Sequence, residues 1–353
     1  SRGLGDVYKR QIMKKVYFLD FCDPKVFNGK GKFVATSKAR NDVTSIVKRC
    51  LETIYVPIIR HSTNKVLGPL EIIIRIFLAL LKIPKGSYVL IQYPFVNLKA
   101  FRVISSRFKN FNTIAVIHDL PSLRFPASNK ISDEIAVLNN FSCLIVHTEA
   151  MKNKLQEYGL NKKYCVLGCF DYLLTKEQNA VRKPDEIVFA GQLSKSIFLN
   201  DFGKLNFNRV TFNLYGKDVP SLKFPKFLSY KGAFLPNDIS AIEGEWGLLW
   251  DGDSIDSCSG NIGEYLRIIA PHKLSLYIAC QLKVIVWENS AMASYILDNH
   301  LGIAISKLSE IEEKIALLTS QDIDFMNRCI EKESFALRNG HMLANALQCA
   351  IEN

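Results

Sequence analysis

The sequence lacks the short glycine-rich motifs of several large enzyme classes. The glycine- and lysine-rich segment 28–32 has neither the spacing nor the Ser/Thr of a phosphate-binding P-loop. No G-x-G-x-x-G follows an apolar run, and no G-x-S-x-G is present. These absences argue against a P-loop NTPase, an enzyme with a dinucleotide cofactor and an α/β-hydrolase.

Paired cysteines are also missing. The nine cysteines form no C-x-x-C pair, and Cys165 and Cys169 have no His or Cys partners at zinc-like spacing. Cys143 and Cys280 lie inside apolar runs. We therefore expect the cysteines to be small core residues of a reduced, cytosolic protein.

The charge is positive but dispersed. The formal net charge is +11, yet no dense run of lysine or arginine and no nucleic-acid-binding motif occurs, which argues against a nucleic-acid partner. We expect residues 1–12 to be a non-native prefix, because DVYKRQ matches a translated transposon end from a sequencing library. Without the prefix, whose three cations and one anion are lost, the charge is +9. Such a charge favours anionic ligands such as nucleotides, or an acidic membrane surface.

No apolar run is long enough to span a bilayer. The longest, 67–83, has 17 residues and contains Glu71, Arg75 and Lys82. It predicts a buried or half-buried helix, and the alternative is a helix lying on the membrane surface. Only four apolar residues separate Lys15 from Asp20, so no signal peptide is expected. The expected location is cytoplasmic, with the inner face of the cell membrane as the alternative.

Short apolar runs alternate with helical stretches along the whole chain, a pattern typical of parallel sheets covered on both faces. A polar stretch interrupts the alternation and indicates a linker between two domains. We expect an α/β protein with two Rossmann-like domains facing each other across a cleft. The expected divisions are 13–174 for the first domain, 175–186 for the linker, 187–335 for the second domain and 336–353 for a C-terminal helix.

In the first half, the candidate residues follow a buried strand and open a helix. His118 and Asp119 follow the run 113–117, where a histidine could act as a general base. A structural hydrogen bond in the loop is the alternative, and His147 after the next strand allows the same two interpretations. The segment 36–42 opens the first helix with Ser37 as the expected N-cap.

In the second half, the strongest local signal lies between Trp246 and Trp287. Two buried strands flank an acidic, small-residue loop and a helix that begins at Pro271-His272-Lys273. Helix N-termini attract phosphates, and ligands of open α/β sheets bind at the carboxyl ends of strands. The segment therefore predicts a phosphate-bearing ligand, most simply a sugar nucleotide, with Ser275 one turn into the helix.

Further side chains at strand ends are candidates for the same ligand. Lys195 could reach a phosphate, Tyr215 a base or ribose, and Glu264 the ribose hydroxyls. Asp251 and Asp253 form a D-x-D, which can hold a divalent cation. Because this pair follows a complete first α/β domain, we expect it to shape the sugar-nucleotide pocket, with no metal required.

The ordered set of segments resembles a bacterial glycosyltransferase family. That family includes β-1,6-galactofuranosyltransferases and the glucosyltransferase that extends GlcNAc on serine-rich adhesins. The segments that carry the resemblance are TSKARNDV (36–43), VIHDLPSLR (116–124), LIVHTEAMKNKL (144–155), LGCFDYL (167–173), VFAGQLSKS (188–196) and the block 246–287. Ile268-Ile269-Ala270 departs from the polar, Asn-containing stretch that relatives commonly carry there.

The resemblance implies a GT-B fold, metal-independent transfer from a UDP-sugar and, often, a homo-oligomer. It implies UDP contacts at Lys195, Tyr215 and Lys273, with Thr36 facing the donor across the cleft. We expect transfer of a galactofuranosyl or glucosyl group to a saccharide acceptor of a surface polysaccharide or glycoprotein. The alternatives are a sugar-nucleotide epimerase on the same scaffold and a catalytically silent partner subunit of a glycosyltransferase.

Overall fold

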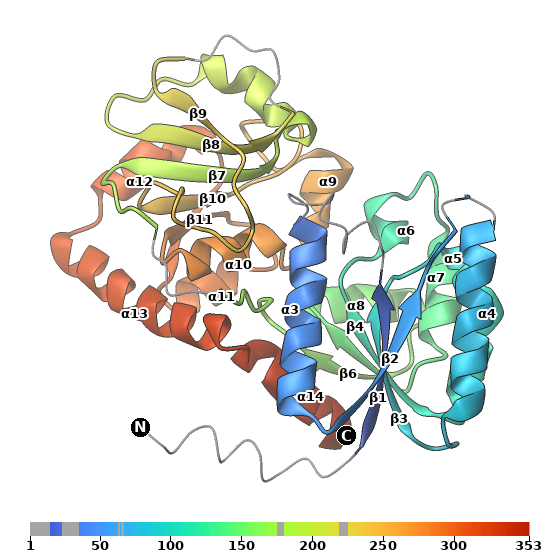
Figure 1. The fold of residues 1–353 in the computed structure, drawn as a ribbon. Coiled ribbons are helices and arrows are strands. Elements are labelled where there is room, and N and C mark those ends of the chain that lie inside the picture. The colour runs from blue at the N-terminus through green and yellow to red at the C-terminus, as the bar shows by residue number, and fades with distance from the viewer. Residues whose placement is uncertain are drawn as a thin grey trace, which may run out of the picture. The chain divides into compact units, whose positions relative to one another are not determined.

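Parallel strands form two separate six-stranded sheets in the computed structural model of the chain (Figure 1). The structure describes residues 15–22, 35–62, 64, 67–174, 180–218 and 225–352. The expected prefix 1–12, the segment 28–32 and residues 175–179 of the expected linker lie outside this description.

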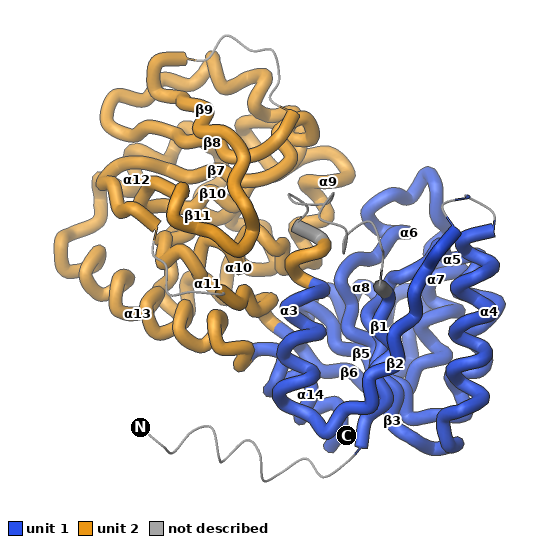
Figure 2. The backbone as a smooth tube through the Cα atoms, in the orientation of Figure 1, with its two compact units in different colours: residues 1–32, 40–167, 342–353 blue, residues 33–39, 168–341 orange. Residues whose placement is uncertain are grey.

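The chain divides into two compact units, coloured separately in Figure 2. The first unit contains residues 1–32, 40–167 and 342–353, and the second contains 33–39 and 168–341. The last helix therefore belongs with the first unit, although it follows the second in the sequence.

The first unit is a doubly covered parallel sheet with strand order β2-β1-β3-β4-β5-β6. Its strands are β1 (Val16–Cys22), β2 (Thr53–Ile59), β3 (Tyr88–Tyr93), β4 (Asn112–Ile117), β5 (Cys143–Val146) and β6 (Lys163–Val166). Its helices are α3 (Ala35–Cys50), α4 (Leu67–Lys82), α5 (Leu98–Ser105), η1 (Ser106–Asn110), α6 (Pro121–Arg124), α7 (Ile131–Leu138), α8 (Glu149–Glu157) and α14 (His341–Glu352). The first residues of α3, 35–39, are counted with the second unit. Strand order reverses beside β1, because β2 lies on one side of it and β3 on the other.

The middle strands of this sheet are mostly apolar because helices cover both of their faces. In β3, β4 and β5 almost every residue is buried. Helices α4, α5 and α7 pack beside one another, and Phe101, Phe108 and Phe141 form an aromatic cluster with Tyr93 beneath them. The packed core holds the carboxyl ends of β1, β3 and β4 at one edge of the sheet.

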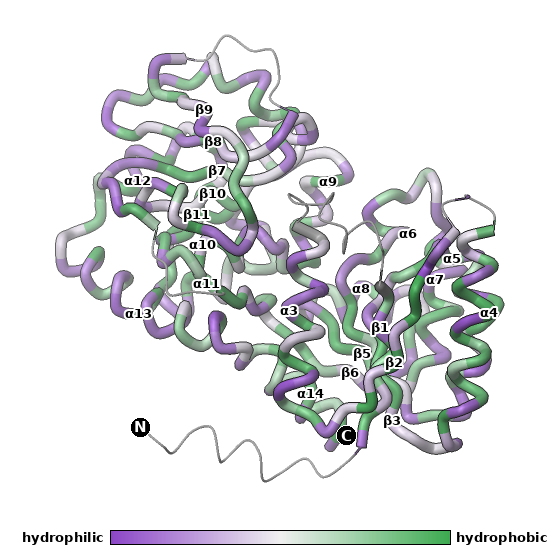
Figure 3. Tube along the Cα trace, viewed as in Figure 1, coloured by the Kyte–Doolittle hydropathy of each residue, from purple (hydrophilic) through white to green (hydrophobic). Residues whose placement is uncertain are grey.

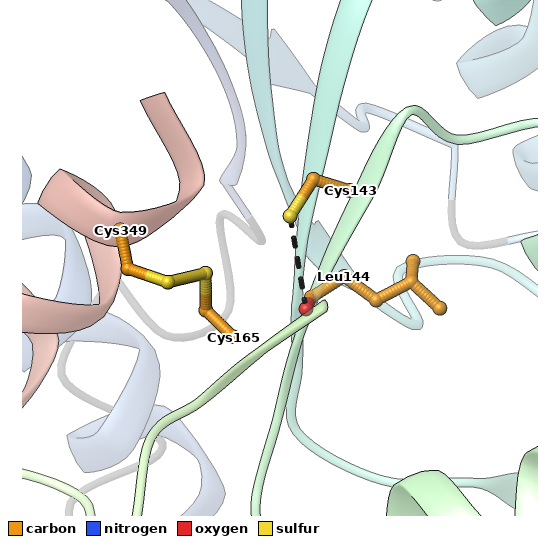
Figure 4. Close-up of a disulfide and its surroundings, with 4 residues drawn as sticks. All are labelled: Cys143, Leu144, Cys165 and Cys349. Carbon is orange, nitrogen blue, oxygen red and sulfur yellow. Dashed lines mark hydrogen bonds between the residues drawn. A yellow bond between two sulfur atoms is a disulfide. The ribbon is translucent and has the colours of Figure 1, made fainter. Parts of the chain in front are cut away.

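A disulfide fixes the last helix to the first unit. Cys165 of β6 is bonded to Cys349 of α14, as Figure 4 shows. The Tyr88 hydroxyl donates to the Ile351 carbonyl, which adds a second link. The prediction that the cysteines are all reduced is therefore wrong for this pair, while Cys143 and Cys280 are buried core residues as expected.

The second unit repeats the parallel design with strand order β12-β11-β10-β7-β8-β9. Its strands are β7 (Glu186–Gln192), β8 (Thr211–Lys217), β9 (Leu228–Gly232), β10 (Trp246–Leu249), β11 (Lys283–Trp287) and β12 (Gly302–Ile305). Its helices are η2 (Leu193–Lys195), η3 (Ile197–Lys204), α9 (Gly260–Tyr265), α10 (His272–Ala279), α11 (Ala293–Asp298), η4 (Leu308–Glu310), α12 (Ile311–Ala316) and α13 (Ser320–Arg338). An aromatic core that includes Trp246, Trp250 and Trp287 packs against this sheet.

Two expected helix boundaries differ in the structure. The expected C-terminal helix 336–353 includes the end of α13 and the whole of α14, because the chain turns at Gly340, which has a φ of +83° that favours glycine. Helix α3 begins at Ala35, so Ser37 lies inside it and is not its N-cap. The expected fold class, two Rossmann-like α/β domains, is confirmed.

Candidate functional site

In the second unit, the carboxyl end of β10 meets the start of α10. The Lys273 ammonium lies 2.7 Å from the Asp251 carboxylate and donates to the Trp250 carbonyl at 3.0 Å. It also lies 4.8 Å from the centre of the Phe189 ring, on β7. Both charged side chains are less than a fifth exposed, so this is a half-buried ion pair that holds Lys273 over the sheet edge.

The N-terminus of α10 has no side-chain cap. Pro271 occupies the N-cap position, and it makes no side-chain hydrogen bond to the helix. The first N–H groups of a helix have no partner within the helix and carry a partial positive charge. Together with Lys273, the start of α10 therefore provides a cationic surface that suits a phosphate.

His272, the first residue of α10, is enclosed by aromatic side chains. Its ring centre lies 5.2 Å from that of Tyr172 and 6.3 Å from that of Phe170. Burial, together with the charge of nearby Lys38, lowers the pKa of the imidazole to about 3, which makes it neutral at ordinary pH. Within the described residues, its Nε2 is the one buried side-chain nitrogen or oxygen that has no hydrogen-bond partner.

An orphaned buried nitrogen costs free energy unless a ligand or water reaches it. Lys38 lies on the same aromatic cluster as His272, since its ammonium is 4.7 Å from the Tyr172 ring centre and donates to the Leu173 carbonyl. His272 and Lys273 therefore present a neutral imidazole nitrogen and a cation at the start of one helix.

The loop between β10 and α9 is folded tightly around glycines. Gly252 has a φ of +111°, and a Cβ there would lie 2.3 Å from the Ser259 carbonyl oxygen. A Cβ at Gly260 would meet the Asp253 carboxylate. The loop therefore depends on glycine at these positions, and of the D-x-D pair it is Asp251 that pairs with Lys273.

The other sequence-predicted residues of this unit fall into two groups. Lys195 and Glu264 are exposed, and Glu264 pairs with Arg267 at 2.6 Å. By contrast, Tyr215 is only 2% exposed, and its hydroxyl accepts the Glu243 N–H. Ser275 is fully buried, with its hydroxyl 3.3 Å from the Cys169 sulfur.

Both side chains are therefore buried in the protein core, and the expected ligand contacts of Tyr215 and Ser275 stay predictions. Thr36 lies in α3, but its side chain is outside the described residues. Its expected role facing the donor stays a prediction.

In the first unit, a hydrogen-bonded chain of polar side chains crosses the carboxyl ends of three strands. The His118 ring, after β4, contacts the Gln92 side-chain oxygen on β3 through Nε2 at 2.7 Å. The Gln92 amide nitrogen lies 3.2 Å from the Asp20 carboxylate on β1 and 3.3 Å from the Arg40 carbonyl. It also contacts the Thr44 hydroxyl on α3 at 3.1 Å.

This geometry fixes the histidine tautomer. The Arg40 carbonyl can only accept, so the side-chain atom of Gln92 that faces it is the NH₂ group. The Gln92 oxygen then faces His118 and can only accept, which requires a proton on Nε2 of the ring. In the neutral imidazole, Nδ1 therefore carries the basic lone pair.

The acidic end of this chain is held beneath the surface. Asp20 is 7% exposed, and burial raises its pKa, opposed by hydrogen bonds from Thr44 and Tyr55 and by the charges of Lys48 and Arg40. Burial lowers the pKa of the Arg40 guanidinium to about 10. Arg40 remains a cation near neutral pH and donates to the Pro94 carbonyl.

The two other strand-end candidates of this unit have structural partners. The Asp119 carboxylate accepts the Leu120 N–H and pairs with Arg124 at 2.6 Å. His147 is buried against the Ile117 carbonyl at 2.9 Å, and burial lowers its pKa to about 4. Both groups stabilise the turns that follow β4 and β5.

A cavity of about 450 Å³ lies between α4, the end of β2 and residues 94–97. Arg60, Ile72 and Phe95 contribute to its lining, and so does Pro94, whose carbonyl binds Arg40. The cavity therefore borders the polar chain that ends at His118.

Sequence reasoning missed Asp20, Gln92 and Thr44 because each is a single polar residue in an otherwise apolar strand or an ordinary helix. The sequence signal that could have identified Asp20 and Gln92 is a polar residue near the end of an apolar strand. Their convergence depends on the strand order, which places β1 beside β3 and β3 beside β4.

Comparison with known proteins assigns both halves of the chain. The model of the Glucosyltransferase 3-like N-terminal domain matches residues 25–169, and that of the Glucosyltransferase 3-like C-terminal domain matches residues 187–350.

Two curated relatives extend over most of the chain. The β-1,6-galactofuranosyltransferase WbbI of Escherichia coli (strain K12) is 29% identical over 252 residues, covering 70% of this chain and 73% of that protein. Glucosyltransferase 3 of Streptococcus gordonii is 24% identical over 325 residues, covering 89% of this chain and 93% of that protein.

Among solved structures, the chain is similar to a proposed UDP-N-acetylglucosamine 2-epimerase from Listeria monocytogenes. The TM-score is 0.51 at 12% identity, over 96% of this chain and 95% of that one. This likeness concerns the fold alone and agrees with a GT-B arrangement of two Rossmann-like domains. With family models over both halves of the sequence, the chain belongs to the glucosyltransferase 3-like family and is a glycosyltransferase of GT-B fold.

Proposed function

We propose that the chain transfers a hexosyl group from a UDP-sugar to a hydroxyl of a saccharide acceptor. The single observation that carries the proposal is the start of α10, where Lys273 and the orphaned His272 Nε2 lie at an uncapped helix N-terminus. The relatives named as galactofuranosyl- and glucosyltransferases support a galactofuranosyl or glucosyl donor.

The second unit holds the donor in this proposal. The diphosphate lies against the N-terminus of α10, and the Lys273 ammonium uses a third donor beyond those given to Asp251 and Trp250. His272 Nε2 contacts a polar atom of the same ligand. Lys195 and Glu264 are both exposed, and in this proposal Lys195 contacts a phosphate and Glu264 contacts the ribose hydroxyls.

The first unit activates the acceptor. The acceptor hydroxyl attacks the anomeric carbon, the bond from that carbon to the UDP oxygen breaks, and His118 takes the hydroxyl proton. Gln92 is the positioning residue, since it holds the proton on Nε2. The ion pair with Arg124 makes Asp119 the weaker candidate for the base.

Charge on the departing UDP is stabilised by Lys273 and the helix N–H groups, so the proposed reaction requires no metal ion. Preorganised donors of this kind act on charge that develops in the transition state. We further propose a saccharide of a surface polysaccharide or glycoprotein as acceptor, and action on the cytoplasmic side of the membrane.

The test is UDP release from a panel of UDP-sugars, with and without saccharide acceptors and with and without magnesium. Lys273→Met is compared with Lys314→Met, an exposed lysine of α12. We expect the first variant to weaken UDP binding in calorimetry by about tenfold or more, because a charge-assisted hydrogen bond contributes about 1.5–3 kcal/mol. The control should bind as the wild type does.

Unchanged UDP affinity in Lys273→Met would remove α10 from the donor site. Conversion of a UDP-sugar to its epimer without any acceptor would indicate an epimerase. No affinity for UDP at all would indicate a silent partner subunit.

A further inference from the structure

Helix α4 carries a continuous apolar stripe on its exposed side. Its members share exposures between 37% and 66%: Leu67, Leu70, Ile74, Phe77, Leu78 and Leu81. With 3.6 residues per turn, these positions fall within an arc of about 100°. The stripe is therefore one face of the helix, along its whole length.

The opposite face of α4 is the one that packs on the first unit. Gly68, Ile72, Ile76 and Leu80 are buried there. Apolar residues therefore lie on both faces of the helix. They appear as the green stretches of the α4 tube in Figure 3. Burial in the core accounts for only one of these faces, and exposed apolar surface of this extent marks an interaction site.

Cations border the stripe on both sides. Arg75 and Lys82 are exposed and lie along one side of it on α4. On the other side, the Arg107 guanidinium of η1 lies 5.2 Å from the Phe77 ring centre. From residue 67 to residue 110, the chain contains seven Lys or Arg residues and one acid, Glu71, which pairs with Arg75 at 3.0 Å.

We infer that the α4 face binds the surface of an anionic phospholipid bilayer, with the apolar stripe inserted among the acyl chains and the bordering cations at the headgroups. An apolar face edged by Lys and Arg is the composition of helices that lie in the membrane interface. Charge complementarity selects this occupant, because Lys82 and Arg75 on one side of the stripe and Arg107 on the other can contact anionic headgroups while the stripe is inserted.

The same helix does not cross the membrane. Within the described ranges, no helix combines the length and hydropathy of a bilayer span. The inference goes beyond the proposed transfer reaction and is tested without donor or acceptor, so its failure leaves the proposed function unaffected.

The experiment is sedimentation of the purified protein with vesicles of phosphatidylcholine, alone or mixed with phosphatidylglycerol, at low and high salt. We expect binding to the mixed vesicles that weakens with added salt. Leu70→Gln/Ile74→Gln/Leu78→Gln should reduce partitioning by about tenfold or more, because three half-exposed apolar side chains no longer enter the bilayer. Arg107→Gln should reduce it by about fivefold, on mixed vesicles only.

The matched control is Leu317→Gln/Phe335→Gln, which removes two exposed apolar side chains from the second unit. It should bind vesicles as the wild type does. The lipid and salt dependence of the wild type tests the inference even if the triple variant is poorly folded.

Wild type that stays in solution with anionic vesicles would overturn the inference. So would binding that the triple variant and the control lose equally. Self-association of the wild type through α4, seen by analytical ultracentrifugation and abolished in the triple variant, would assign the face to a second copy of the chain.

Discussion

Replacement of His272 by phenylalanine separates stability from ligand binding. The ring keeps its place against Phe170 and Tyr172, while the orphaned Nε2 is removed. A buried polar atom without a partner costs about 1–3 kcal/mol. We therefore expect His272→Phe to stabilise the second unit by roughly 1 kcal/mol at pH 8, or about 2–4 °C in its melting temperature.

The same substitution should also change how the free energy of unfolding depends on pH. The folded pKa of His272 is about 3, below the unfolded value of about 6.5. Between these values the unfolded chain binds a proton that the folded protein does not, so stability falls as the pH decreases. At pH 5 this loss is roughly 2 kcal/mol, at about 1.4 kcal/mol per pH unit, and His272→Phe abolishes it.

Calorimetric melts from pH 5 to pH 8 measure the gain in stability and the loss of its acid dependence. Titration with a UDP-sugar measures the effect of the substitution on ligand affinity. We expect the affinity to fall by about tenfold as the stability rises, because the ligand loses one hydrogen bond. His61→Phe, at an exposed histidine, is the control. A destabilised variant with the acid dependence of the wild type would refute the reasoning, since it would show that Nε2 already has a partner.

Two further predictions concern the first unit. Gln92→Leu should lower kcat by about 100-fold with little change in UDP affinity, because His118 then loses the acceptor that fixes its tautomer. Steady-state kinetics and UDP titration measure the two quantities. An unchanged kcat would show that Gln92 has no part in the reaction. Cys349→Ser should destabilise the first unit by about 2–5 kcal/mol, because it opens the loop closed with Cys165. Denaturant melts with and without reductant measure this loss, and reductant should affect the wild type only.

The residues that sequence analysis placed correctly are those whose position follows from local pattern. Buried strands followed by helices predict where carboxyl ends and helix starts lie, and the structure has His272 and Lys273 at the start of α10 and His118 directly after β4. The roles expected for these three residues stay predictions. Which way a side chain points is not local. Tyr215 lies at a strand end and Ser275 in the first turns of a helix, as expected, and tertiary packing buries both side chains.

The sequence by itself determined the alternation of strands and helices, the division into two α/β halves and the family to which the segments belong, because each depends on neighbours along the chain. Only the tertiary structure decided that Asp20, Gln92 and His118 form one hydrogen-bonded chain, since strand order joins residues far apart in sequence. The bond from Cys165 to Cys349 has the same cause: α14 returns to the first unit and brings two distant thiols together.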